Sequence, residues 1–72
     1  MENKKDNFKR IAESRTNKII AMIGLLGNLS NQSYYEYEDS QIERIFDAIQ
    51  NAVDEEREKF NRNRDKTKRF RL

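Results

Sequence analysis

Hydrophobic residues recur along the chain at the three- and four-residue spacing of amphipathic helices. In the first half, an apolar stripe begins near Asp6 and stays on one face at about 100° per residue. Its members are Phe8, Ala12, Ile19, Ile23 and Leu26. This stripe predicts a helix over about residues 6–27. The Gly27-Asn28 pair predicts that the helix ends there in a left-handed cap.

A second apolar stripe, with alternating four- and three-residue steps, predicts a helix over about residues 39–61. Its members are Ile42, Phe46, Ile49, Val53 and Phe60, with Ile45 beside them. At its start, Tyr37 and Ile42 have the spacing of a hydrophobic staple, and Gln41 has the place of the distal half of a capping box. The N-cap itself is either Glu38, a poor capping residue, or Asp39.

Two helices joined by a loop over residues 28–38 predict an all-α fold, with residues 1–60 forming an antiparallel helical hairpin. Arg15 and Glu56 interrupt the two stripes, and in such a hairpin they lie within about one turn of each other. We expect a partly buried ion pair that sets the register, within one chain or across a dimer. The alternative is two long side chains that reach sideways into water.

Apolar residues surround the end of the first helix instead of marking one stripe. They are Ile19, Ile20, Met22, Ile23, Leu25 and Leu26. One neighbouring helix cannot cover them all, and the small residues Ala21, Gly24 and Gly27 would let another backbone approach the back of this helix. Leu, Ile, Val and Phe number only 16 of 72 residues, which is little core for a monomer. We therefore expect a homodimeric four-helix bundle with those six residues at the dimer interface, and a heterologous partner as the alternative.

Charge is strongly segregated although the net charge is only +2. Residues 1–27 carry six basic and three acidic groups, residues 28–56 one and eight, and residues 57–72 eight and two. Residues 61–72 form a basic C-terminal arm, helical or flexible, that suits a polyanion. Its basic members are Arg62, Arg64, Lys66, Lys68, Arg69 and Arg71. On the first helix, Arg10 and Lys18 share a polar face with Ser14 and Asn17, which favours phosphate contacts or ordinary solvation.

The predicted loop carries LLGNLSN at residues 25–31 and SYYEY at residues 33–37, followed by IFDAI at residues 45–49. This arrangement resembles small helical proteins of bacterial mobile elements such as phages and plasmids, over about residues 8–60. The resemblance implies a helical hairpin and a mobile-element origin, without a mechanism. Tyr34, Tyr35 and Tyr37 either stack on unpaired bases or cover the loop end of the bundle. Asn28, Ser30, Asn31 and Ser33 are expected to hydrogen-bond within the loop.

Catalytic chemistry has few candidates in this chain. It contains no histidine and no cysteine, and so lacks their nucleophiles, acid–base groups and zinc ligands. Four carboxylates share one side of the second helix: Asp39, Glu43, Asp47 and Asp54. We interpret them as a solvated face or as a docking stripe for a basic partner, in preference to a metal site. With no Gly-rich phosphate loop, we expect no enzyme, no cofactor and no bound metal.

Binding is therefore the expected function. The first hypothesis is a non-enzymatic helical adaptor that binds nucleic acid or a nucleoprotein through its basic arms. The second is a phage or plasmid inhibitor or regulator that binds a host defence or nucleic-acid-processing protein through its acidic helix face. A purely structural assembly subunit is a third. The longest apolar run, residues 19–26, is far shorter than the roughly 18 residues that span a bilayer, and no signal pattern is evident, so we expect a cytoplasmic protein.

Overall fold

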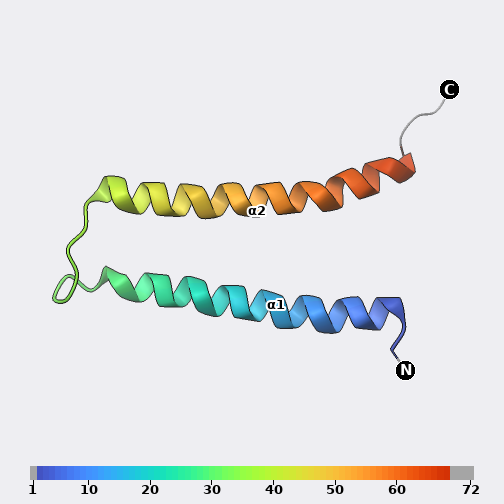
Figure 1. Ribbon diagram of the computed structural model, residues 1–72, viewed down its shortest axis with the longest axis horizontal. Coiled ribbons are helices and arrows are strands. Elements are labelled where there is room, and N and C mark those ends of the chain that lie inside the picture. Colours follow the sequence, from blue (N-terminus) through green and yellow to red (C-terminus); the bar gives the residue numbers. More distant parts are fainter. Residues whose placement is uncertain (1, 69–72) are drawn as a thin grey trace. The chain divides into compact units, whose positions relative to one another are not determined.

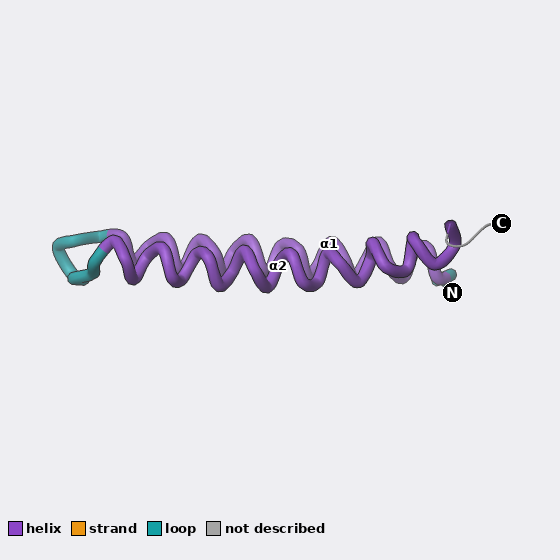
Figure 2. The backbone as a smooth tube through the Cα atoms, turned by 90° about the horizontal axis from the view of Figure 1, so that it is seen from above, coloured by secondary structure: helices purple, strands orange, loops and turns teal. Residues whose placement is uncertain are grey.

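The computed structural model describes the backbone of residues 2–68 and the side chains of residues 2–64. Two helices account for most of this described part, and it contains no strand (Figure 1). They are α1 (Lys4–Gly27) and α2 (Asp39–Lys68), and a short 3₁₀ turn, η1 (Asn28–Ser30), follows α1 directly. Figure 2 marks the connecting residues in teal. The predicted all-α class is confirmed, and the chain divides between Glu36 and Tyr37 into two units, each containing one long helix.

Helix α1 begins at Lys4 because Asn3 caps it. The Asn3 backbone is extended, and its side-chain Oδ1 accepts a hydrogen bond from the Asp6 backbone N–H at 2.8 Å. Its carbonyl oxygen accepts from the Asn7 N–H at 2.9 Å. Asp6 adds a negative charge to the first turn, where the helix dipole favours it. The helix thus starts two residues before the start at Asp6 that was predicted from the apolar stripe. The stripe did not indicate the true start, because the capping residue is polar.

The end of α1 at Gly27 is confirmed, but the predicted left-handed cap is wrong. Asn28 has φ −64° and ψ −19°, which is right-handed, and the chain continues into η1. The Asn28 N–H points to the carbonyl oxygens of Gly24, Leu25 and Leu26. Tightening into a 3₁₀ turn thus gives the last carbonyls a partner without any positive φ.

Asn31 organises the connection between the helices. Its carbonyl oxygen accepts from the N–H groups of Tyr34 at 3.1 Å and Tyr35 at 3.0 Å. Its side-chain Oδ1 accepts from the Ser33 N–H at 2.9 Å, which is an Asx-turn. The expected hydrogen bonding by Asn31 and Ser33 is confirmed, and it fixes the backbone that leads into the tyrosines.

Helix α2 begins with the predicted capping interaction. The Gln41 side-chain Oε1 accepts from the Glu38 N–H at 2.8 Å, while the Glu38 carbonyl accepts from the N–H groups of Gln41 and Ile42. Glu38, and not Asp39, therefore occupies the N-cap position. Tyr37 and Ile42, the predicted staple, are both partly covered.

Helix α2 continues to Lys68, seven residues beyond the predicted end at 61. Phe60 is the last apolar residue of the predicted stripe, so nothing in the hydrophobic pattern required the helix to go on. Asn61 and Arg64 support the added turns, because the Arg64 Nη2 donates to the Asn61 Oδ1 at 3.0 Å. The basic arm was expected to be either helical or flexible, and its residues 61–68 are helical. Arg69 and Arg71 lie outside the described residues.

Side-chain burial is low throughout the described chain. None of these residues is buried, and only seven are of intermediate exposure. They are Ile11, Ala12, Leu26, Tyr37, Ile42 and Ile49, with the polar Asn61 as a seventh intermediate position. The two helices are thus ordered mainly by their own backbone hydrogen bonds. Long helices in proteins usually take most of their stability from packing an apolar face.

Replacing Asn3 tests the cap of α1. We expect Asn3→Ala to destabilise the first turn by about 1 kcal/mol, because the Asp6 N–H loses its acceptor. Hydrogen exchange of the first-turn amides measures the effect. Asn3→Asp is the matched control, since aspartate caps equally well, and equal exchange in Asn3→Ala and wild type would contradict the capping role.

Candidate functional site

The basic end of α2 is the first candidate site, and we define it as Arg62, Arg64, Lys66 and Lys68. Arg62 and Arg64 are exposed on the helix. Lys66 and Lys68 lie within the helical backbone of α2, each four residues beyond one of these arginines. The pairs therefore occupy successive turns, which gives the helix two rows of positive positions. A rigid backbone presents such charges to a polyanion without the entropy cost of ordering an arm.

The basic residues of α1 are in a different environment. The Arg10 Nε lies 2.9 Å from the Glu2 carboxylate, and its Nη2 donates to the Asn7 Oδ1 at 2.9 Å. The guanidinium is thus held and partly neutralised by its own helix end. Lys18 is exposed on the same helix. Of the two, Lys18 is the better placed for a phosphate.

The acidic row of α2 is exposed along its length, at Asp39, Glu43, Asp47 and Asp54. Asp54 accepts a hydrogen bond from Gln50 Nε2 at 3.0 Å. Among the described residues, no three carboxylates converge as a possible metal site. The row therefore presents separated charges along one side of a helix, an arrangement that suits a broad basic surface.

The apolar end of α1 is open on several faces. Met22 is 68% exposed, Leu25 64% and Ile20 61%; Met22 and Leu25 share one side of the helix, and Ile20 lies on the opposite side. Leu26 is partly covered. An added Cβ on Gly24 would meet nothing within 4 Å. This end of the helix thus combines exposed large side chains with open space at a glycine.

The α2 seam, which we define as Ile42, Phe46, Ile49, Val53, Glu56 and Phe60, is the second apolar surface. Phe46 is 45% exposed and Val53 43%, while Ile42 and Ile49 are partly covered. Its regular spacing is that of a helix that packs on another along one line. The seam is continuous over five turns except at Glu56.

Glu56 has a partner within α2, because its Oε1 lies 2.8 Å from the Lys59 Nζ. Arg15 belongs to the other unit of the chain. The predicted ion pair between Arg15 and Glu56 stays a prediction, now with Lys59 as a competitor for the carboxylate.

The tyrosines of the connection differ in exposure. The Tyr34 ring is 81% exposed and the Tyr35 ring about half, while Tyr37 is partly covered next to α2. Tyr34 therefore offers an accessible ring face, as stacking on a base requires.

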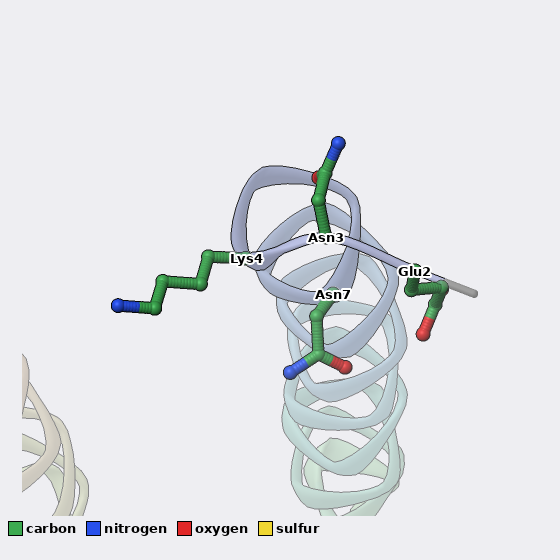
Figure 3. A pocket seen from close by; sticks show the side chains of 4 residues that line it. All are labelled: Glu2, Asn3, Lys4 and Asn7. Atoms are coloured by element: carbon green, nitrogen blue, oxygen red, sulfur yellow. The ribbon is translucent and has the colours of Figure 1, made fainter.

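Neither of the two surface depressions on α1 has the form of a small-molecule site. One is lined by Glu2, Asn3, Lys4 and Asn7, and the other by Ala12, Glu13, Thr16 and Asn17. Figure 3 shows that the four side chains of the first depression point in four different directions. Ligand pockets instead have convergent polar groups within an apolar lining.

Several side-chain contacts were not predicted from the sequence, among them those of Arg10 with Glu2 and Asn7 and that of Glu56 with Lys59. The spacings Asn7–Arg10 and Glu56–Lys59 are both i, i+3, so the ordinary rule for neighbours on a helix surface gave the signal. The Glu2–Arg10 contact spans eight residues and depends on how the chain enters the helix, for which the sequence carried no signal.

Comparison with known proteins found no matching family model, no matching curated protein and no matching solved structure. No helix in the described part of the chain is both long and apolar enough to cross a membrane. Functional inference therefore depends on the surfaces described above.

A double-mutant cycle tests the predicted ion pair. We expect Arg15→Ala and Glu56→Ala to be non-additive in the free energy of unfolding by about 0.5–3 kcal/mol, because each removes the partner of the other. Urea denaturation of the two single variants and the double variant measures the coupling. The cycle of Arg15→Ala with Glu58→Ala, an exposed carboxylate of α2 away from the seam, is the control and should be additive, and additivity in both cycles would rule the pair out.

Proposed function

We propose that this protein is a non-enzymatic helical adaptor that self-associates and binds nucleic acid or a nucleoprotein through the basic end of α2. One observation carries the proposal: α2 continues as a helix for two turns beyond Phe60, and these turns bear Arg62, Arg64, Lys66 and Lys68. These two turns contain four basic residues and no large apolar residue, so they cannot contribute to a hydrophobic core.

The charge of this segment favours a phosphate backbone as its ligand. Lys and Arg side chains that replace condensed counterions supply most of the affinity of sequence-independent binding. Such contacts position a protein on a nucleic acid without reading its bases. The basic end of α2 therefore favours binding with little sequence preference, and Tyr34 offers a ring for stacking on an unpaired base.

Self-association follows from the uncovered apolar surfaces. We infer that the helices form an antiparallel hairpin, and that two hairpins form a four-helix bundle around residues 19–26. The support is the exposure of Met22 and Leu25 on one face of α1 and of Ile20 on the opposite face, which one neighbouring helix cannot cover together. A dimer would bring two basic ends to one ligand, so that avidity compensates for weak single contacts.

A salt series tests nucleic-acid binding. We expect the triple variant Arg62→Gln, Arg64→Gln, Lys66→Gln to bind single- and double-stranded DNA and RNA more weakly than wild type. The slope of log K against log salt should flatten by about two to three, because each lost phosphate contact removes about 0.7–0.9 from it. Fluorescence anisotropy between about 50 and 200 mM salt measures both quantities.

The matched control for the salt series is Lys4→Gln, Lys5→Gln, Lys9→Gln, which changes the net charge equally at the other end of the sequence. It should keep the wild-type slope. If both triple variants lose the same slope, binding depends on net charge alone and the basic end of α2 is not the site.

A second candidate function is supported by the exposure of the acidic row: an inhibitor or regulator, encoded by a phage or plasmid, that imitates phosphate charge toward a basic host protein. Asp39→Lys with Asp47→Lys separates the two proposals. A nucleic-acid binder should bind DNA at least as well as before, since the repulsion is reduced. A loss of host-protein capture with unchanged DNA binding would favour the inhibitor.

Substitutions at the apolar end of α1 test self-association. We expect Met22→Gln with Leu25→Gln to weaken the dimer by at least about 3 kcal/mol, because each buried side chain contributes about 1.5–3 kcal/mol. Sedimentation equilibrium over a dilution series measures the dissociation constant. Ser14→Gln, on the polar face of the same helix, should leave it unchanged, and a monomeric wild type at micromolar concentration would remove the homodimer.

A further inference from the structure

The α2 seam is symmetric about its own centre. Ile42 and Phe60 each lie nine positions from Asn51, and Ile49 and Val53 each lie two positions from it. If a second copy of α2 runs in the opposite direction about this centre, Ile42 lies opposite Phe60 and Ile49 opposite Val53. Every apolar position of the seam except Phe46 then faces an apolar position of the other copy, as in an antiparallel coiled coil.

The charges beside the seam are symmetric about the adjacent position, Gln50. Glu43 and Arg57 lie seven positions before and after Gln50, and all three are exposed along one flank of the seam. In the antiparallel pair, Glu43 of each copy lies beside Arg57 of the other, and the two Gln50 side chains meet at the centre. A parallel pair instead places Lys59 beside Arg64 of the other copy, which is a repulsive contact.

Acidic and basic residues are also unevenly distributed along the whole of α2. Residues 39–56 of α2 contain six acidic groups and one basic group, whereas residues 57–64 contain four basic groups and one acidic group. Antiparallel pairing about Asn51 places residues 39–45, with Asp39 and Glu43, opposite residues 57–63 of the other copy, whereas parallel pairing places the basic turns of the two copies on each other. Complementary charge of this kind selects an orientation more strongly than it adds affinity.

We propose that α2 docks antiparallel on α2 of a second copy of this chain, through the α2 seam and its flank of Glu43, Gln50 and Arg57. Glu56 then lies opposite Phe46, at the place where Lys59 of its own helix takes the carboxylate at 2.8 Å. This proposal rests on self-association but not on nucleic-acid binding, since none of these residues belongs to the basic end of α2.

A charge swap tests the orientation. Glu43→Arg and Arg57→Glu should each weaken the dimer of the full chain by about tenfold at low salt, because each replaces two attractive contacts by two repulsive ones. The double variant should restore the wild-type dissociation constant to within about twofold, measured by sedimentation equilibrium. Glu43 and Arg57 of one helix lie about 21 Å apart, so they cannot compensate within one chain or in a parallel pair.

The matched control is Arg44→Glu with Glu58→Arg. These residues have the same charges and the same spacing of 14 residues, but they lie on the face of α2 away from the seam. Neither control substitution should change the dissociation constant. Failure of the double swap to restore the dimer would overturn the antiparallel docking, as would a monomeric wild type or an equal effect of the controls. Loss of DNA binding with an intact dimer would count against the proposed function alone.

Discussion

The need to cover apolar helix faces determines what this chain can be. Its two long helices are held by backbone hydrogen bonds, while no described side chain is buried. Hydrogen bonds along a helix offer little net stability, because the unfolded chain makes similar bonds to water. The free energy that fixes the fold must therefore come from covering the end of α1 and the α2 seam. In the proposed dimer, folding would therefore be coupled to self-association.

Charge then decides which surfaces can meet. In the proposed pair, the acidic first part of α2 and the basic groups in its last turns do not add to the apolar surface. They favour one relative orientation of the two helices. Glu43 and Arg57 are an example. As exposed charges, each would add little affinity to the proposed pair, but together they would favour the antiparallel orientation. The basic end of α2 continues the helix past the α2 seam, so that the segment proposed to bind a polyanion and the surface proposed to pair belong to one helix.

The spacing of apolar residues predicted the helices, whereas several features that depend on polar groups were not predicted. The stripe through Ile42 and Phe60 gave the helical class and the start of α2, and Gln41 gave its capping interaction. The end of α2 was placed at 61, because the period stops at Phe60 although helical hydrogen bonding does not. The cap at Asn28 was wrong since a 3₁₀ turn satisfies the same carbonyls as a left-handed residue. For the site, exposure of Arg62 and Arg64 could be predicted, but the capture of Arg10 by Glu2 could not.

The length of α2 has a consequence for the spacing of bound groups. In an antiparallel pair centred on Asn51, Arg62 lies eleven positions beyond the centre in each copy. At about 1.5 Å per residue, the two Arg62 positions are about 33 Å apart along the common axis. One turn of duplex DNA measures about 34 Å. In the proposed pair, the two basic ends would thus have the spacing of positions one turn apart on the same side of a duplex.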